Sequence, residues 1–587
     1  MENNHSLPQN VLLSVKDLQV KFRVRGRILT AIRGISLDIY ENESIAIVGE
    51  SGSGKSVFTK TFAGMLDENG FISQGDIVFN DPDLAVTNVH YGPRQRKMVA
   101  SLTEKLCRYS RYELGANTWR AMQELKSAEA QRAGVDADFE REITAKIDDL
   151  TFRMTELFNH KQTLDPSAEK AQIKEEARQI NAYKEEIKGL RRELEDARAK
   201  SEKAHRNDAA AIAAYKDKMA ALKEQYDKEI SGEITDEVAR RNERIAKEIY
   251  LSAGRFNYSR RTRLISALTQ AIKKAMIMGV DLDDENALNQ VFDTIIFRVR
   301  YTGEDENTLR GICVLNLAKI KDSKDWTQIR GSRIATVFQD PMTSLNPIIT
   351  IGKQITSIIL KHQNCTEFEA RERAIVLMKK VGIPNAEKRF DDYPFQYSGG
   401  MRQRIVIAIA LSCQPKILIC DEPTTALDVT IQAQILELLK ELQKEFNYTI
   451  VFITHDLGVV ANIADRVAVL YAGQVVELGK VEEVFYDPRH PYTWSLLSSL
   501  PQLAERRSKL FSISGTPPSL YNTIVGDPFA PRNQFAMKID TLKEPPMFRI
   551  TDTHYAKTWL LDPRSPKVEK PEAIKDIHEK LTRAFNI

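Results

Sequence analysis

One short segment constrains the fold of this 587-residue chain more than any other. The apolar run ESIAIVG at residues 43–49 predicts a buried strand, GESGSGKS overlaps its end, and VFTKTFAGML then predicts a helix. A strand, a glycine loop and a helix in this order are typical of a phosphate-binding loop, because glycines bring backbone N–H groups close to phosphate oxygens and the helix N-terminus favours negative charge. Lys55 can then reach the β- and γ-phosphates of a nucleotide, and Ser56 can bind Mg²⁺.

Two adjacent carboxylates follow a second apolar strand. The strand ILIC ends at Asp421 and Glu422. Asp421 suits Mg²⁺, directly or through water, and Glu422 suits the polarisation of an attacking water as a general base. Two further polar residues follow apolar strands: Gln339 after RIATVF and His455 after VFIT. By itself, a glutamine or a histidine in such a place is usually structural, so their interpretation depends on the motifs around them.

Four motifs occur in one order: GESGSGKS at residues 49–56, FQDP around Gln339, YSGGMRQR at 397–404 and ILICDEP at 417–423, followed by ITHD around His455. In this order and context the chain resembles the ATP-binding subunit of an ABC transporter. The strings FQDPMTSLNP, SGGMRQR and HPYT further resemble the D-type subunit of the oligopeptide/dipeptide-permease family. The resemblance covers roughly residues 10–85 and 320–535. It implies an α/β fold, the ABC-type P-loop nucleotide-binding domain with a helical subdomain.

The resemblance implies a role for each motif. Glu422, His455 and Gln339 would form the catalytic group at the γ-phosphate, and the glutamine loop would also touch a membrane partner. Residues 398–400 would close over ATP bound to a second head in a head-to-tail dimer, whose interface Asp428 would cross. The expected metal ligands are Ser56, Gln339 and Asp421. The expected nucleotide-binding residues are Phe22 (stacked on adenine, or else a core aromatic of its strand), Gly49, Ser51, Gly52, Gly54, Lys55, Ser56, Val57, Ser398, Gly399, Gly400 and Asp428.

A long insertion interrupts the resemblance. About 230 residues are inserted between the strand GDIVF and the segment that leads into Gln339, and a long insertion at a surface loop costs little closure entropy. We therefore predict three parts. They are a discontinuous ABC nucleotide-binding domain at 10–88 and 320–500, a mainly helical, coiled-coil-like insertion domain at 89–319, and a C-terminal oligopeptide-transporter-type tail at 501–587.

The insertion is predicted to contain long helices. Residues 168–230 include no proline and one glycine, and from Tyr183 onward apolar or small residues recur at alternating spacings of four and three, a heptad pattern. The sequence HRND at 205–208 could bend the segment into an antiparallel hairpin. A straight helix would be about 95 Å long, and a hairpin about half that. Balanced charge favours a solvated helix surface over a nucleic-acid contact, and the basic string at 259–263 is interpreted in the same way.

The tail lacks ligands that its resemblance would supply. In the family this region often carries four cysteines for an iron–sulfur cluster, in a pattern like CPFxPRC. Here Asp527, Asn533 and Asp540 occupy the first three of those positions, and no cysteine follows Cys420. Because such clusters need thiolates, we expect no iron–sulfur cluster. The five cysteines of the chain are scattered, which favours reduced thiols.

Composition argues against direct membrane insertion and gives no special argument for nucleic acid. Charged residues make up 28% of the chain, hydrophobic residues 42%, and the formal net charge is +3. No apolar run approaches the roughly 18–20 residues that span a bilayer, and the polar first ten residues lack a signal-peptide stretch. Any membrane role is therefore expected to be peripheral, through partners, and no nucleic acid is expected as a partner.

The resemblance implies an ATP-hydrolysing subunit that uses ATP and Mg²⁺ to power import of oligopeptides or dipeptides, at the cytoplasmic face of the cell membrane. The implied partners are a second, F-type ABC ATPase subunit, two transmembrane permeases and an extracellular peptide-binding lipoprotein. Nickel or another small solute is the alternative cargo.

Two other classes of function are open to an ABC head with a helical insertion. A soluble ABC ATPase of the chromosome-maintenance or DNA-repair type also inserts a coiled coil, but there the glutamine loop precedes the coiled coil, whereas Gln339 follows the insertion here. A non-hydrolysing interaction protein would be expected to have lost Lys55, Asp421, Glu422 or His455, and this chain keeps all four.

Overall fold

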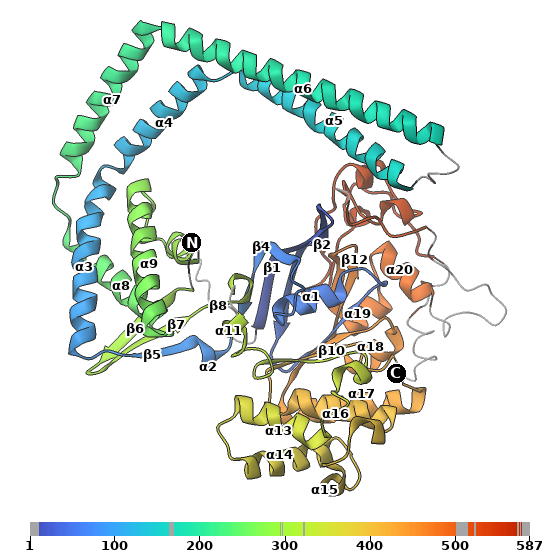
Figure 1. Ribbon diagram of the computed structural model, residues 1–587. Coiled ribbons are helices and arrows are strands. Elements are labelled where there is room, and N and C mark those ends of the chain that lie inside the picture. Colours follow the sequence, from blue (N-terminus) through green and yellow to red (C-terminus); the bar gives the residue numbers. More distant parts are fainter. Residues whose placement is uncertain are drawn as a thin grey trace. The chain divides into compact units, whose positions relative to one another are not determined.

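The computed structural model describes residues 11–163, 170–293, 295, 297–320, 323–425, 427–499, 513, 515–521, 524–571, 574, 575 and 577. The chain divides into two compact units: Met1–Ala85 with Val314–Ile587, and Val86–Cys313 (Figure 1). The polar N-terminal stretch at 1–10 and the predicted start of the tail at 501 lie outside the described residues. Within the described part of the chain, no helix combines the length and the apolar character needed to cross a bilayer.

The first unit is built on an eight-stranded sheet with the order β14-β15-β13-β12-β3-β11-β10-β9. Its central strands, β12, β3, β11, β10 and β9, are parallel. They are almost wholly buried, as expected for a parallel sheet covered on both faces, and this burial explains their continuous apolar runs. The strands are β3 (Ser44–Val48), β9 (Ile334–Val337), β10 (Ile417–Asp421), β11 (Thr449–Ile453), β12 (Arg466–Tyr471), β13 (Gln474–Lys480), β14 (Phe548–Arg549) and β15 (Tyr555–Ala556).

An antiparallel sheet with the order β2-β1-β4-β8 completes the strands of this unit. The short strand β8 pairs with the end of β4, and Asn316 ties them together: its Nδ2 donates to Asp76 Oδ1 over 2.7 Å, and its Oδ1 accepts from the Ile77 N–H over 3.1 Å. The chain therefore leaves this sheet at the end of β4 and returns to it as β8, which pairs with the end of β4. The strands are β1 (Val11–Val24), β2 (Arg27–Tyr40), β4 (Gly70–Phe79) and β8 (Leu315–Asn316).

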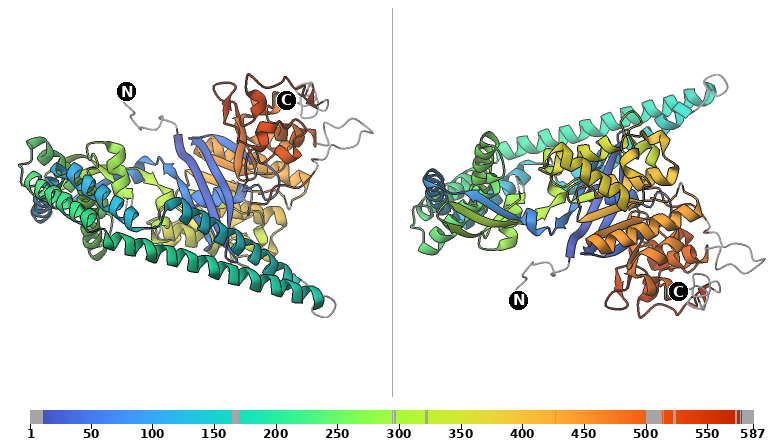
Figure 2. Two further views of the ribbon diagram at one scale, coloured as in Figure 1. Left: turned by 90° about the horizontal axis from the view of Figure 1, so that it is seen from above. Right: turned by 90° about the horizontal axis from the view of Figure 1, so that it is seen from below.

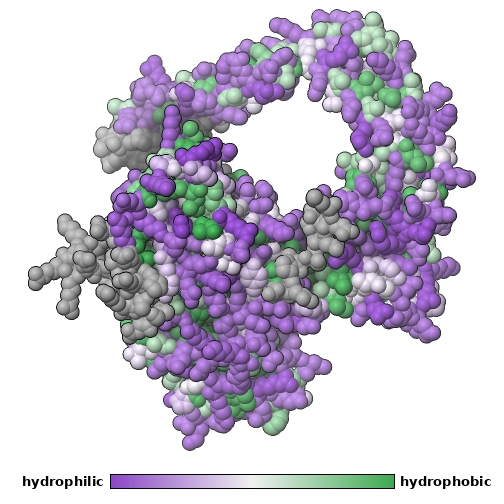
Figure 3. Space-filling model, turned by 180° about the vertical axis from the view of Figure 1, so that it is seen from behind, coloured by the Kyte–Doolittle hydropathy of each residue, from purple (hydrophilic) through white to green (hydrophobic). Residues whose placement is uncertain are grey.

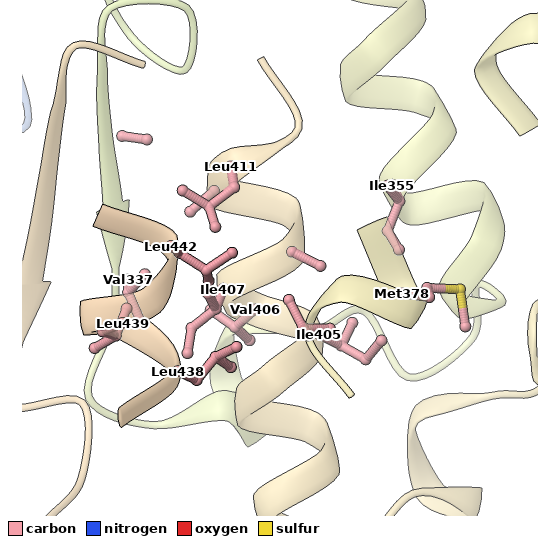
Figure 4. Close-up of a cluster of buried hydrophobic side chains, with 14 of the residues drawn as sticks. Val337, Ile355, Met378, Ile405, Val406, Ile407, Leu411, Leu438, Leu439 and Leu442 are labelled. Carbon is pink, nitrogen blue, oxygen red and sulfur yellow. The ribbon is translucent and has the colours of Figure 1, made fainter. Parts of the chain in front are cut away.

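Four helices of the first unit share an apolar core (Figure 4). Ile355 of α13, Met378 of α14 and Ile405 of α16 are buried in it, together with Leu438 and Leu439 of α17. This core anchors the segment that carries the YSGGMRQR motif at the start of α16. The helices of the unit are α1 (Lys55–Phe62), α2 (Pro82–Ala85), α11 (Ser323–Trp326), α12 (Pro341–Ser344), α13 (Ile351–His362), α14 (Glu367–Lys380), α15 (Ala386–Arg389), α16 (Gly399–Leu411), α17 (Val429–Phe446), α18 (Leu457–Ile463), α19 (Val481–Tyr486) and α20 (Pro491–Ser498).

The second unit has a base in which helices pack on a three-stranded antiparallel sheet of order β5-β7-β6. At its centre Arg298 Nε donates to Glu248 Oε2 over 2.7 Å, and both side chains are buried. The sequence did not predict this sheet, because β5 and β7 lie at opposite ends of the unit and meet only in the folded chain. The elements of the base are β5 (Val86–His90), β6 (Val299–Asp305), β7 (Thr308–Cys313), α3 (Pro93–Leu114), α8 (Asp236–Gly254), α9 (Tyr258–Met278) and α10 (Glu285–Asp293).

Two antiparallel helix pairs extend from this base. We call them the helical arm: α4 (Ala116–Ala133), α5 (Ala137–Thr163), α6 (Lys170–Asn207) and α7 (Ala209–Glu229). In the views of Figures 1 and 2, α5 lies along α6 and α4 along α7. On α6, Ile180 and Ile187 are buried and Tyr183 is half-buried. The surface of the arm is mostly hydrophilic, with hydrophobic residues scattered along it (Figure 3).

Of the two alternatives left open for residues 168–230, a straight helix or an antiparallel hairpin with its bend at 205–208, the structure contains neither. Asp208 Oδ1 accepts from the Ala211 N–H over 3.0 Å and begins α7, so the chain continues beyond α6 and does not fold back on it. The partner helices are interrupted at the same level, between α4 and α5. Arg132 Nη2 pairs there with Asp208 Oδ2 over 3.2 Å, and His205 Nε2 lies 2.8 Å from Glu129 Oε1. The α4–α5 and α6–α7 halves of the arm are therefore interrupted side by side.

Candidate active site

The phosphate loop has a backbone that demands glycine. Gly49 has φ 152°, and a Cβ on it would lie 2.2 Å from the carbonyl oxygen of Leu470. Gly54 caps α1 in the left-handed region with φ 101°. These conformations are open to glycine and costly for other residues. The loop thus places the first N–H groups of α1 at the end of β3, as the sequence predicts.

Lys55 is the cation of this loop. Its Nζ donates to the carbonyl oxygens of Gly49, over 2.8 Å, and of Glu50, over 3.1 Å. Burial lowers the pKa of Lys55, and the nearby carboxylates of Glu422 and Asp421 oppose that change. An ammonium group held in this way, with only 7% of the residue exposed, is placed for an anionic ligand of the loop.

Ser56 and Asp421 meet next to Lys55. Ser56 Oγ donates to Asp421 Oδ1 over 3.1 Å. Burial raises the pKa of Asp421, and the hydrogen bond from Ser56 opposes that rise. A hydroxyl and a single carboxylate suit Mg²⁺, which usually takes one or two protein carboxylates together with substrate phosphates and water. No cluster of three or more His, Cys, Asp or Glu side chains that could hold a metal ion occurs among the described residues.

The Glu422 carboxylate lies within hydrogen-bonding distance of the side chains of Gln339 and His455. Gln339 Nε2 donates to Glu422 Oε2 over 3.1 Å, and His455 Nδ1 lies 3.2 Å from Glu422 Oε1. Glu422 follows β10, Gln339 follows β9, and His455 follows β11, so the parallel register of these strands brings the three residues together. Glu422 itself has φ 46°, an uncommon value for a non-glycine residue that is found preferentially at functional sites.

Thr425 is a member of this group that sequence reasoning missed. Its Oγ1 donates to Glu422 Oε2 over 3.2 Å. The signal available in the sequence was a hydroxyl residue three positions after the carboxylate, which is too common in turns to be specific. With Thr425, the Glu422 carboxylate has three side-chain partners, which orient it.

The predicted signature residues form a separate group. Ser398 caps α16, where its Oγ accepts from the Met401 N–H over 3.4 Å, and Asp428 caps α17, where its Oδ1 accepts from the Ile431 N–H over 3.0 Å. Gly400 packs against Ile431, since a Cβ on it would lie 2.7 Å from the Ile431 side chain. Within the described parts of the chain, no hydrogen bond or ion pair connects Ser398, Gly399, Gly400 or Asp428 to Lys55, Ser56 or Glu422.

Three further predicted residues lie on elements around the loop. Phe22 of β1 is half-buried and packs on Gly70 of β4, where a Cβ would lie 2.7 Å from the ring. Ser51 is exposed in the loop next to Gly52, and Val57 is half-buried on α1. Phe22 is thus compatible with both of its predicted roles.

The sequence pattern of the ABC transporter family matches residues 32–226 and 302–425, more than half of the chain. The chain belongs to the ABC transporter family. The pattern described as the oligopeptide/dipeptide transporter C-terminal region matches residues 476–539, so this ABC protein also carries that region. The predicted resemblance is confirmed. As a member of the family, the chain is an ABC-type ATPase that binds ATP.

Named relatives of this ABC protein share much of its sequence. The oligopeptide transport ATP-binding protein AmiE of Streptococcus pneumoniae is 66% identical over 266 residues, which cover 45% of this chain and 75% of AmiE. The oligopeptide transport ATP-binding protein OppD of Bacillus subtilis is 59% identical over 263 residues, 45% of this chain and 74% of OppD. The dipeptide transport ATP-binding protein DppD of Lactococcus lactis is 58% identical over 260 residues, 44% of this chain and 74% of DppD.

Proposed function

We propose that this ABC ATPase powers the import of oligopeptides or dipeptides. The observation that carries the proposal is the convergence of Gln339, His455 and Thr425 on Glu422, at strand ends next to the Ser56–Asp421 pair. That arrangement supplies a base, a metal-side pair and a phosphate loop, the parts that ATP hydrolysis needs. The cargo class is inferred from the relatives, which are named for oligopeptide and dipeptide transport, and from the matched C-terminal region.

In the proposed reaction, water attacks the γ-phosphate of ATP and yields ADP and phosphate. Glu422 accepts a proton from that water, and Gln339 and His455 orient the carboxylate and the γ-phosphate. Lys55 exchanges its two carbonyl partners for phosphate oxygens. Mg²⁺, when bound, would be held by Ser56 and Asp421, with Gln339 nearby, and would offset phosphate charge.

The proposed ATPase acts as a head-to-tail dimer. The place of the signature at the N-terminus of α16 supports this, because a helix N-terminus favours a phosphate while the head already has its own phosphate loop, so the signature would serve the nucleotide of a second head. The second head would be another ABC ATPase subunit, for which the F-type remains our proposal. Two membrane permeases and an extracellular peptide-binding lipoprotein would complete the importer, and this chain would sit at the cytoplasmic face of the membrane through them.

We also propose the domain organisation predicted above. The nucleotide-binding domain at 10–88 and 320–500 would carry an insertion domain at 89–319 that uses its coiled-coil-like arm for a protein contact. The tail at 501–587, without an iron–sulfur cluster, would pack on the nucleotide-binding domain. Deletion of residues 90–318 should then leave the ATPase active and impair assembly or transport. Unchanged assembly and transport would argue against a contact role for the insertion.

The experiment that tests the proposed function combines isolation and uptake. The tagged chain, purified gently in detergent from its own cells, should bring along two multi-spanning membrane proteins, a second ABC ATPase and a solute-binding lipoprotein. Membrane vesicles containing that assembly should take up labelled short peptides in the presence of ATP, and Glu422→Gln should abolish uptake. Recovery with ribosomes or DNA-bound factors from the soluble fraction would overturn the proposal.

A further inference from the structure

Two residues of the matched C-terminal region (476–539), Tyr492 and Arg532, form hydrogen bonds with the phosphate loop. Glu50 lies within GESGSGKS, between Gly49 and Ser51, and it carries a charge in a loop that binds anions. Arg532 pairs with this carboxylate through both of its terminal nitrogens, Nη1 to Oε2 over 2.8 Å and Nη2 to Oε1 over 3.0 Å. The two residues are separated by 482 positions. The guanidinium is almost fully shielded from solvent, with 5% of its side chain exposed, and 25% of the Glu50 side chain is exposed.

The same region also holds the backbone of Glu50. The Glu50 N–H donates to the hydroxyl of Tyr492 in α20 over 2.8 Å. The Glu50 carbonyl accepts from Lys55 Nζ over 3.1 Å. The amide, the carbonyl and the carboxylate of one loop residue are therefore all engaged, and two of the three partners come from the C-terminal region.

An aromatic cluster supports Arg532. The rings of Tyr471, Tyr492 and Phe529 are buried, with centroids 4.6 to 5.4 Å apart. Arg532 Nη1 donates to the Tyr471 hydroxyl over 3.2 Å, and the Arg532 N–H donates to the Phe529 carbonyl over 2.9 Å. The ring cluster and the bond to Tyr471 fix the Arg532 guanidinium in place. Its planar geometry then suits the two parallel hydrogen bonds to the Glu50 carboxylate.

The charge of the Glu50 carboxylate lies near the place where the nucleotide phosphates would bind. The Glu50 carboxylate acts electrostatically on Lys55, the cation that would bind the phosphates in the proposed function. Without Arg532, that carboxylate would be an uncompensated negative charge in a loop that must accept a triphosphate. Charge-assisted bidentate pairs are strong, and removing one partner of a shielded pair costs far more than removing an exposed pair.

We propose that Arg532 is a positioning residue for ATP binding, which neutralises Glu50 and fixes the phosphate loop from the C-terminal region. The inference rests on the proposed ATPase function and deepens it. It makes the C-terminal region part of the nucleotide site and gives it a direct means of changing ATP affinity: any rearrangement that withdraws Arg532 exposes the phosphates to the Glu50 charge.

A double-mutant experiment on the full-length protein tests the proposal. The dissociation constant for a fluorescent ATP analogue and the KM and kcat of hydrolysis are measured for wild type, Arg532→Met, Glu50→Gln and the double variant. Arg532→Met should weaken ATP binding and raise KM about tenfold, within the usual 5- to 150-fold range of coupling effects, with a smaller change in kcat. Adding Glu50→Gln should restore most of the affinity, because the charge responsible is gone. The defect of Arg532→Met should shrink at high ionic strength.

Arg564→Met is the matched control, because Arg564 is an exposed arginine that follows the matched C-terminal region and pairs with the nearby Asp562. Affinity within twofold of wild type is expected for it. A merely structural role for Arg532 would lower thermal stability without rescue by Glu50→Gln, and that result overturns the proposal. If Arg532→Met does not fold, Glu50→Gln alone decides: unchanged or tighter ATP binding supports the proposal, and binding weakened tenfold overturns it. A wild-type chain that binds no ATP would refute the proposed function itself.

Discussion

Ser56 and Asp421 are separated by 365 positions, yet Ser56 Oγ donates a hydrogen bond to Asp421 Oδ1 over 3.1 Å. Ser56 lies in the first turn of α1, directly after the glycine loop, and Asp421 is the last residue of β10. The whole helical unit lies between them in the sequence. This pair joins the phosphate loop to the edge of the sheet that carries Asp421 and Glu422.

Asp421→Asn should reduce the rate of Mg²⁺-dependent ATP hydrolysis at least about 100-fold, because the amide cannot offer the charge that a hard divalent cation requires. ATP binding in the presence of EDTA should change little. A Mg²⁺ titration of the hydrolysis rate measures the effect, with Ser73→Ala, an exposed hydroxyl of β4, as the control. An unchanged Mg²⁺ dependence would exclude Asp421 as the metal-side residue.

Glu422→Gln should lower kcat about 100-fold or more while ATP still binds, because a neutral amide cannot accept the proton of the attacking water. The ATP-bound dimer should then accumulate, which light scattering at matched protein concentrations would detect. Glu482→Gln, on an exposed glutamate of α19, is the control and should hydrolyse ATP normally. Rapid hydrolysis by Glu422→Gln would remove the base from the proposed mechanism.

The buried carboxyl group of Asp527 should make the stability of the protein depend on pH. Burial raises the pKa of Asp527 to about 6 from its ordinary 3.8, the nearby Asp540 and Glu544 carboxylates add to the rise, and the Phe529 N–H and Lys557 oppose it. Because the folded pKa lies above the unfolded one, the stabilising effect of the protonated group is complete below about pH 4 and is lost as pH rises through 6.

Asp527→Asn cannot ionise and should therefore be more stable than wild type at neutral pH. The difference in free energy of unfolding should grow between pH 4.5 and 7.5 and level off at about 3 kcal/mol or less. Denaturant unfolding across this range measures it, with Asp217→Asn, at an exposed aspartate of α7, as a control that should lack the increase. A difference that stays constant with pH would contradict the prediction.

Arg298→Met should destabilise the second unit by about 3–5 kcal/mol, because it leaves the buried Glu248 carboxylate without its guanidinium partner. Arg310→Met is the matched control: its partner Asp305 is exposed, so its loss should cost less than about 1 kcal/mol. Denaturant unfolding followed by a probe in this unit distinguishes the two. Equal effects would mean that the Arg298 pair contributes no more than a surface pair.

The secondary structure around each motif could be predicted from the sequence because it is local. Gly49 and Lys55 are six positions apart in the chain. The apolar run before Gly49 indicates the strand, and the glycines and the residues after them indicate the loop and the helix. The individual residues of the proposed catalytic group could also be predicted, because Gln339, Glu422 and His455 each follow an apolar strand. Their contact was not accessible, since it depends on the register of β9, β10 and β11.

Pairing between distant segments was decided by the tertiary structure. The heptad pattern of α6 indicates a helix with one apolar face but does not specify the partner, and the partner is α5 rather than α7, because Asp208 lets the chain continue as a new helix. The three-stranded sheet of the second unit and the Arg532–Glu50 pair depend in the same way on residues far apart in the chain. The sequence by itself determined the local elements, the ABC family and the residue types of the site. Only the folded chain, through strand register and side-chain packing, decided which of these residues touch.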